Sequence, residues 1–133
     1  MLRVVAALIE HEGRLLSCQR RKDDSFALQW EFPGGKMRAG ETPAAALARE
    51  LQEELGVAAE IGRELYRTRH RYKEMTEELE LIFLAARVDP GAIRNLAFAQ
   101  MRWVAPADLP LLSFLPADRE LITKLAGDEL HLK

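Results

Sequence analysis

The feature that most constrains this chain is a helix that begins after Thr42 and ends before Gly56. Threonine is a favourable N-cap, and the proline that follows it takes the first helical position, where no hydrogen bond is lost. Glycine is the usual residue just beyond a helix C-terminus. At about 100° per residue, the apolar side chains share one arc of about 100°, which predicts a stripe that packs on a core. That stripe consists of Ala44, Leu47, Ala48, Leu51 and Leu55.

Short apolar runs separated by turn residues predict strands before and after this helix. The first two strands are expected to form a hairpin, and a third short strand stops at Pro33. Residues 34–42 contain three glycines and are expected to form a loop. The expected strands are 2–10, 14–20, 30–32, 57–67, 79–88 and 101–104, and further helices are expected at 106–112 and 117–126. This order predicts an α/β fold with a mixed β-sheet, helices on both faces and a single domain over residues 1–133.

Composition excludes several classes of protein. A chain of 133 residues suffices for one domain with a core, and its net charge of −2 gives no basic field for a nucleic-acid polymer. The apolar run at the N-terminus is shorter than the roughly 20 residues that span a membrane. The single cysteine, Cys18, and the widely separated His11, His70 and His131 give neither a disulfide nor a metal-ligand spacing. We expect surface histidines and a cytoplasmic monomer or weak dimer with no membrane partner.

Three glutamates, Glu50, Glu53 and Glu54, share a second arc beside the apolar stripe, because steps of three and four residues relate them. Like charges at this spacing destabilise a helix by roughly 0.2–0.5 kcal/mol per pair, and Arg49 is placed to offset only part of this. A divalent cation would remove the repulsion, since Mg²⁺ prefers carboxylates, water and phosphates as ligands. A solvated acidic face is the alternative interpretation.

The preceding loop favours the metal interpretation. Gly34 and Gly35 let the backbone approach a ligand closely, and the nearby helix N-terminus favours anions. Lys36 can neutralise a phosphate, and Arg20 and Arg21 are further cations at the end of the second strand. Together these residues indicate a phosphate-metal site, although the Walker A pattern is absent.

The same residues resemble a known motif. The chain matches the complete Nudix box, GX5EX7REUXEEXGU, over residues 35–57. The flanking WEFPGGK and the internal GETP resemble the MutT-type branch of this family, whose members clean up nucleoside triphosphates. The resemblance implies a Nudix α/β/α sandwich. It also implies a hydrolase that converts a nucleoside triphosphate and water to the monophosphate and pyrophosphate.

Site residues follow from this resemblance by position. It implies that Glu50, Glu53, Glu54 and the Gly34 carbonyl hold Mg²⁺ or Mn²⁺, with Glu53 a candidate general base. Arg49 belongs to the catalytic group. The resemblance further implies that Glu41 pairs with Arg49 to brace the loop on the helix, and that Arg21 and Lys36 contact phosphates.

One departure from the family pattern concerns a loop well after the box, where many members carry another glutamate. Residues 95–100 contain no carboxylate here, and Gln100 is the closest polar substitute. It could orient a water but could not act as a base. Alternatively, a glutamate from the stretch Glu74 to Glu80 could reach the site.

Asp118 lies in the segment that supplies a base-reading side chain in this branch. That position is often Asn in 8-oxo-dGTP hydrolases and often Asp in cytidine-nucleotide pyrophosphohydrolases. A carboxylate accepts hydrogen bonds from an exocyclic amino group, and a protonated one could read an oxidised guanine. Alternatively, Asp118 only caps the last helix. Phe32 and Tyr72 are candidates to stack on the base, although packing serves Phe32 equally well.

Three functions remain open on these residues. The first is a Mg²⁺-dependent nucleoside triphosphate pyrophosphohydrolase acting on 8-oxo-dGTP or a related nucleotide, or else on CTP, dCTP or 5-methyl-dCTP. The second is a Nudix hydrolase of dinucleotides or nucleotide sugars. The third is a catalytically silent domain that binds a nucleotide, although such domains typically lose glutamates that this chain keeps. The basic stretch 67–73 is either solvated or meets the triphosphate.

Overall fold

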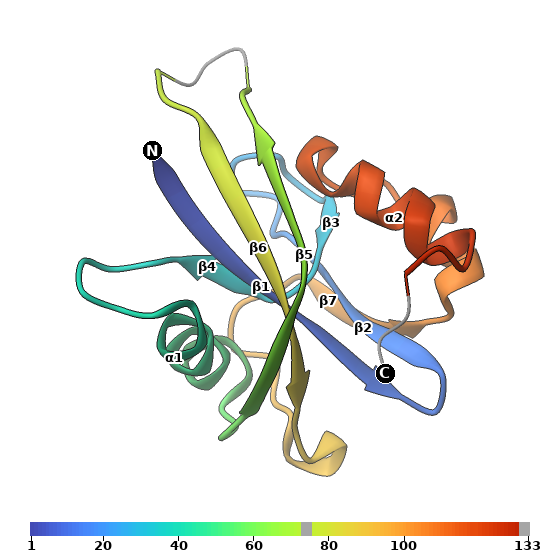
Figure 1. Cartoon of the computed structure of the whole chain (residues 1–133). Helices are drawn as coiled ribbons and strands as arrows, with labels where there is room; N and C mark the ends of the chain where they lie inside the picture. Colours follow the sequence, from blue (N-terminus) through green and yellow to red (C-terminus); the bar gives the residue numbers. More distant parts are fainter. Residues whose placement is uncertain (73–75, 131–133) are drawn as a thin grey trace.

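A mixed sheet organises the protein, seen in a computed structural model that describes residues 1–72 and 76–130 (Figure 1). The expectations for Glu74 and His131 lie outside the described residues. The strands are β1 (Leu2–His11), β2 (Arg14–Gln19), β3 (Trp30–Glu31), β4 (Gly34–Lys36), β5 (Glu60–His70), β6 (Leu79–Arg87) and β7 (Gln100–Val104). The α-helices are α1 (Pro43–Leu55) and α2 (Arg119–Ala126), and short 3₁₀ helices are η1 (Pro90–Ala92), η2 (Pro106–Leu111) and η3 (Pro116–Asp118).

Strand β1 lies at the centre of the sheet, whose strands run in the order β3-β2-β1-β6-β5. It pairs in parallel with β6 over most of its length and antiparallel with β2 and β4, while β7 pairs with β2. The predicted mixed sheet is therefore confirmed. The long parallel pairing leaves both faces of β1 and β6 in need of apolar cover.

The two helices supply that cover from opposite faces (Figure 1). Alternate residues of a strand point to opposite faces, so β1 contributes to two cores. One core joins Val5, Ala7 and Ile9 of β1 to α1 through Ala46, Leu47, Leu51 and Leu55. The other joins Ala6 and Leu8 to α2 through Leu121, Ile122 and Leu125. The expected helices on both faces are present, but Ala44 is exposed and Ala46 is buried in its place.

Helix α1 has the ends that the sequence predicts. The Thr42 hydroxyl accepts a hydrogen bond from the amide of Ala45 at 3.2 Å. Gly56 adopts the left-handed conformation, with φ of 65°, and its amide donates to the carbonyl of Gln52. These caps satisfy backbone groups that the helix itself leaves unpaired.

The largest differences from the prediction concern three elements. The first residues of the expected loop 34–42 form β4, because Gly34 comes so close to β1 that a Cβ there would collide with the carbonyl oxygen of Val5. The strand expected at 57–67 runs from Glu60 to His70. The helix expected at 106–112 is the 3₁₀ helix η2, because Pro110 lacks the amide hydrogen that an α-helix requires.

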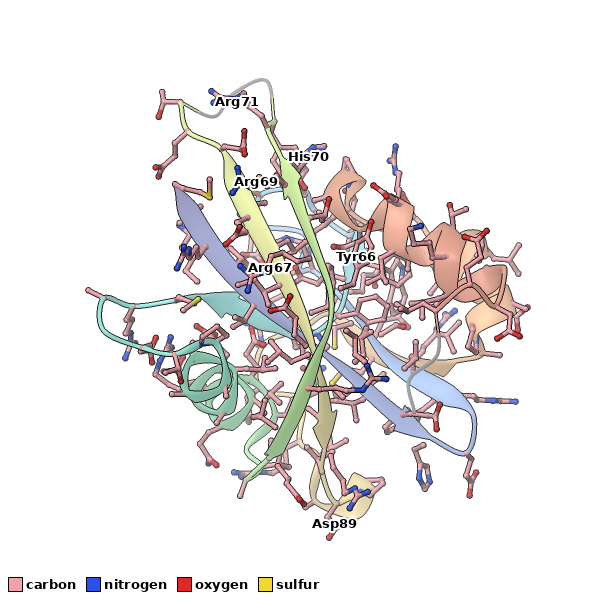
Figure 2. All side chains as sticks on the ribbon, viewed as in Figure 1. Tyr66, Arg67, Arg69, His70, Arg71 and Asp89 are labelled. Carbon is pink, nitrogen blue, oxygen red and sulfur yellow. The ribbon has the colours of Figure 1, made fainter. Side chains whose placement is uncertain are left out.

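Basic residues of β5 lie over the face of the sheet that α1 covers elsewhere, as Figure 2 shows for Arg67 and Arg69. Both contact buried Glu80, at 3.3 and 3.6 Å, and so does Arg3 at 3.3 Å. Arg67 also pairs with a glutamate of its own strand, and Arg69 with one that precedes β6. These arginines are thus paired with carboxylates, while Lys73 of the same basic stretch lies outside the described residues.

Candidate active site

Helix α1 and strand β4 bring the box glutamates against a glycine backbone. The amide of Gly34 donates to Glu54 Oε1 at 3.0 Å. Gly35 lies against Glu50, and a Cβ at this glycine would fall 2.5–2.7 Å from the Glu50 carboxyl atoms. The Glu53 side chain is half exposed, at 50%. Glycine is therefore required at both strand positions for the two glutamates to lie where they do.

Glu54 carries the strongest electrostatic stress of this group. Burial raises its pKa from 4.5 to about 8, assisted by the negative charges of Glu31, Glu50 and Glu53 and opposed by the hydrogen bond from Gly34. A buried carboxylate among other carboxylates is an unfavourable arrangement unless a cation joins it.

The donor set fits a hard divalent cation, because it consists of carboxylate and backbone oxygens. Among residues 1–72 and 76–130, no three His, Cys, Asp or Glu side chains form a ready-made metal cage. The carboxylates of Glu50 and Glu54 instead accept hydrogen bonds from Arg49 and from the amide of Gly34. The residues that could hold the metal are Glu50, Glu53, Glu54 and the carbonyl of Gly34.

Arg49 and Glu41 link the loop to the helix. Arg49 donates to the Glu41 carboxylate at 2.7 and 2.9 Å, to Glu50 at 2.9 Å and to the carbonyl of Lys36 at 3.1 Å. Glu41 also accepts from the amide of Arg38 at 2.7 Å. These hydrogen bonds, led by that from Arg49, lower the pKa of Glu41 to about 2. The two side chains are paired in the manner expected of a brace.

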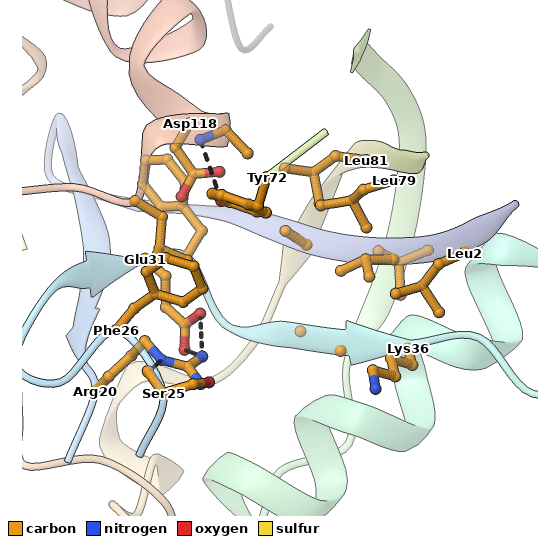
Figure 3. A pocket seen from close by; sticks show the side chains of 18 of the residues that line it. Leu2, Arg20, Ser25, Phe26, Glu31, Lys36, Tyr72, Leu79, Leu81 and Asp118 are labelled. Atoms are coloured by element: carbon orange, nitrogen blue, oxygen red, sulfur yellow. Dashed lines mark hydrogen bonds and ion pairs between the residues drawn. The ribbon is translucent and has the colours of Figure 1, made fainter. Parts of the chain in front are cut away.

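A cavity of about 390 Å³ opens beside these glutamates. Its lining includes Glu54, Gly34, Gly35 and Lys36, and Figure 3 shows Lys36 at one end with Asp118 and Tyr72 at the other. Apolar side chains of β1 and β6 form one wall, namely Leu2, Val4, Leu79 and Leu81. One cavity therefore joins the glutamate group to the residues expected to read a base.

Asp118 is almost fully buried, with 3% of the residue exposed. Its pKa is raised well above the ordinary value by burial and by the charge of Glu31. The residue occupies the N-cap position of α2, but its side chain makes no capping hydrogen bond. The interpretation of Asp118 as a cap is therefore wrong, because the carboxyl group lines the cavity and does not face the amides of the helix.

The two predicted stacking residues differ in their surroundings. Phe32 is 3% exposed and packs against Phe83 and Phe114 with ring centroids 6.3 and 5.2 Å away, so packing accounts for most of its surface. Tyr72 is half-buried, and its hydroxyl accepts a hydrogen bond from the amide of Ala117 at 3.3 Å. Both residues line the cavity.

Two of the predicted polar residues lie elsewhere. Arg21 is exposed and absent from the described lining of the cavity, where its neighbour Arg20 is present instead. Both residues follow β2, and Arg20 is still paired through its amide with Gln29, whereas the carbonyl of Arg21 already accepts the hydrogen bond of a turn from the amide of Asp24 at 3.1 Å. Gln100 donates from its amide nitrogen to Gln19 Oε1 at 2.8 Å, so that its donor is committed to a neighbouring strand.

Glu31 is the residue that sequence reasoning missed. It lies in β3, lines the cavity and accepts two hydrogen bonds from Arg20 at 3.0 and 3.2 Å. Burial raises its pKa, and the charge of Arg20 opposes this. The available signal was a single charged residue between the apolar Trp30 and Phe32, three positions before Gly34.

Comparisons with known proteins agree with this geometry. The NUDIX domain profile matches residues 1–125. A relative named 8-oxo-dGTP diphosphatase, from Haemophilus influenzae, is 35% identical over 96% of this chain and 93% of its own length. The CTP pyrophosphohydrolase of Escherichia coli is 34% identical over 90% and 94%.

No helix within the described residues is long and apolar enough to cross a membrane.

Solved structures agree with the sequence comparisons. A crystal structure of a MutT NUDIX hydrolase from Burkholderia pseudomallei superposes with a TM-score of 0.79 at 29% identity, covering 92% of this chain and 95% of that one. The chain belongs to the NUDIX domain family, among its MutT-type hydrolases.

Proposed function

We propose that this chain is a divalent-metal-dependent nucleoside triphosphate pyrophosphohydrolase that removes an oxidised nucleotide such as 8-oxo-dGTP from the cytoplasmic pool. The reaction would convert the triphosphate and water to the monophosphate and pyrophosphate. The observation that carries the proposal is the single cavity that joins Glu54 and Gly34 at one side to Asp118 at the other. The activities named for the two relatives, an 8-oxo-dGTP diphosphatase and a CTP pyrophosphohydrolase, support the same reaction.

The glutamate side of the cavity suits the triphosphate. Lys36 presents an ammonium group there, and the Gly34–Gly35 backbone allows phosphate oxygens to approach without side-chain interference. Glu50, Glu53 and Glu54 would hold Mg²⁺ or Mn²⁺, which when bound would polarise a phosphoryl oxygen and lower the pKa of the attacking water. Arg49 keeps the Glu50 carboxylate in place, and Glu41 keeps Arg49 in place.

Glu53 is the proposed general base. Its carboxylate is half exposed and is held only by longer contacts, at 3.5 Å to Arg49 and 3.6 Å to Arg38. It can therefore turn toward a water without losing a strong hydrogen bond. Residues 95–100 contain no carboxylate that could take this role instead. Gln100 is the polar residue closest to the position where many family members carry a glutamate.

Asp118 is the proposed base-reading residue. Its raised pKa favours the protonated carboxyl group, which offers one donor and one acceptor side by side. This pair matches the O6 acceptor and N7–H donor of 8-oxoguanine, and equally the N3 acceptor and N4 amino donor of cytosine. Unmodified guanine presents two acceptors, O6 and N7, on the corresponding edge and fits less well. Hydrolysis of cytidine triphosphates is accordingly the second candidate function.

The experiment is a substrate panel with Mg²⁺ that contains 8-oxo-dGTP, dGTP, CTP, dCTP, 5-methyl-dCTP, ADP-ribose and diadenosine polyphosphates, followed by detection of the monophosphate and pyrophosphate. We expect 8-oxo-dGTP or a cytidine nucleotide to be preferred over dGTP. Tight binding without turnover of any compound would instead indicate a silent domain. In the Asp118→Ala variant, which removes both the donor and the acceptor, we expect an altered order of preference with the pyrophosphate product unchanged, and an unaltered order would refute the role of Asp118.

A further inference from the structure

The loop between β2 and β3 carries an unusual backbone. Phe26 and Leu28 both adopt left-handed conformations, with φ of 52° and 61°. This region is unfavourable for residues with a Cβ and is uncommon for large apolar residues in particular. Both side chains are also exposed, at 40% and 50%. Neither burial of these side chains nor a glycine explains the conformation, so the surrounding contacts must impose it.

Arg20 supplies one set of those contacts. Its guanidinium donates to the carbonyl of Ser25 at 2.7 Å, to the Ser25 hydroxyl at 3.2 Å and to both oxygens of Glu31. Arg20 thereby joins the residue that precedes Phe26 to strand β3. Figure 3 shows these residues at one side of the cavity.

A second set of contacts starts from Gln100. Its side-chain amide donates to Gln19, and Gln19 donates to the carbonyl of Leu28 at 3.0 Å. The backbone closes the base of the loop, because the amide of Leu28 donates to the carbonyl of Arg20 at 3.2 Å and the amide of Arg20 donates to the carbonyl of Gln29 at 2.9 Å. The loop is thus held at both ends and at its middle.

The two left-handed residues differ in what they face. Phe26 lines the cavity, and its ring lies 4.8 Å from the ring of Tyr72 with the planes tilted by 43°. The hydroxyl of Tyr72 in turn accepts a hydrogen bond from the amide of Ala117, which precedes Asp118 in the sequence. Leu28 is absent from the described lining of the cavity. The contacts therefore place one exposed aromatic ring against Tyr72, in the cavity that the proposed base-reading residue Asp118 also lines.

We propose that residues 20–29 form a clamp for the nucleobase, in which Phe26 supplies the stacking surface and Arg20 is a positioning residue. The inference rests on the proposed nucleotide substrate. Asp118 would hydrogen-bond to the edge of a base, whereas the Phe26 ring would stack on its face, so the two residues would recognise different features. Every base has such a face, and the clamp therefore raises affinity for nucleotides in general while Asp118 selects among them.

The test compares Phe26→Gly with the matched Leu28→Gly. Glycine accepts positive φ readily, so each variant removes a side chain without opposing the backbone conformation. In Phe26→Gly we expect KM for the preferred triphosphate to rise about tenfold with kcat within about twofold, as for loss of one base–aromatic stack. Leu28→Gly should leave KM within about twofold of the wild type.

Product inhibition distinguishes binding of the base from binding of the phosphates. The inhibition constant of the nucleoside monophosphate should rise about tenfold in Phe26→Gly, while that of pyrophosphate, which has no base, stays unchanged. Arg20→Lys should raise the same constant for the monophosphate, because lysine cannot bridge Ser25 and Glu31 with one planar fork. Phe26→Tyr should leave both inhibition constants at their wild-type values, since tyrosine keeps the aromatic ring.

Equal effects of Phe26→Gly and Leu28→Gly would overturn the clamp, as would a matching rise for pyrophosphate. Calorimetric titration of the wild type and both variants with the monophosphate repeats the comparison without turnover. If no triphosphate is hydrolysed, the proposed function fails, but a selective loss of monophosphate binding in Phe26→Gly would still support the clamp. Turnover with an unchanged KM in that variant would reject the clamp alone.

Discussion

Glu54→Gln is expected to make the metal-free protein more stable while greatly reducing its stabilisation by Mg²⁺. Glutamine has nearly the shape of glutamate, and its amide oxygen can still accept the hydrogen bond from Gly34. The substitution removes a charge that lies among other carboxylates and is largely buried. It therefore relieves stress in the folded state and leaves the unfolded chain almost unaffected.

The magnitude follows from the pKa. A carboxyl group whose pKa is raised on folding holds its proton more tightly in the folded state, so stability falls as pH rises between 4.5 and about 8. At about 1.4 kcal/mol per pH unit, that interval corresponds to about 5 kcal/mol in the free energy of unfolding. Because the carboxyl group reaches an open cavity, water and ions reduce this figure, and we expect about 2 to 5 kcal/mol.

The assay is urea unfolding of metal-free protein at about pH 5 and about pH 9. The wild type should lose stability between the two values, and Glu54→Gln should lose less by the stated difference. The control is Glu53→Gln, whose parent side chain is half exposed and should change unfolding by less than about 0.5 kcal/mol. Mg²⁺ at a hundredfold excess over its Kd should stabilise the wild type at the higher pH by about 2.7 kcal/mol, and Glu54→Gln by far less.

Equal pH dependence in the wild type and Glu54→Gln would refute the reasoning, because the carboxyl group would then titrate alike in the folded and unfolded states. An equal gain from Glu53→Gln would also refute it. In that case general charge on the helix, and not the burial of one carboxylate, would be responsible.

Further predictions concern the support of the same site. Gly35→Ala should weaken Mg²⁺ binding at least about tenfold by displacing Glu50, as for other supporting groups of metal ligands. Gly91→Ala, where a Cβ would meet nothing closer than 3.5 Å, should leave calorimetric Mg²⁺ titrations unchanged, and a similar loss in both variants would contradict this explanation. Glu41→Ala should lower kcat about tenfold or more with the helix intact by circular dichroism, because Arg49 loses the partner that fixes it, and wild-type kcat would contradict the brace.

Much of the fold was predictable because its signals are local. The caps of α1, its apolar stripe and the hairpin of β1 and β2 depend on residues a few positions apart. The errors arose where contacts between distant segments decide. Strand β4 exists because Gly34 can approach β1, and Ala46 is buried in place of Ala44 because of where the sheet lies under the first turn of α1.

The chemistry of the site divides in the same way. The sequence by itself determined the glutamates of α1, their spacing and their pairing with a glycine-rich segment, because helical periodicity converts sequence distance directly into direction. Only the tertiary structure decided that Arg20 and not Arg21 faces the cavity, that Glu31 lies near Glu54, and that Phe26 meets Tyr72. Those relations join strands and loops that are far apart in the chain, and no local spacing encodes the distance between them.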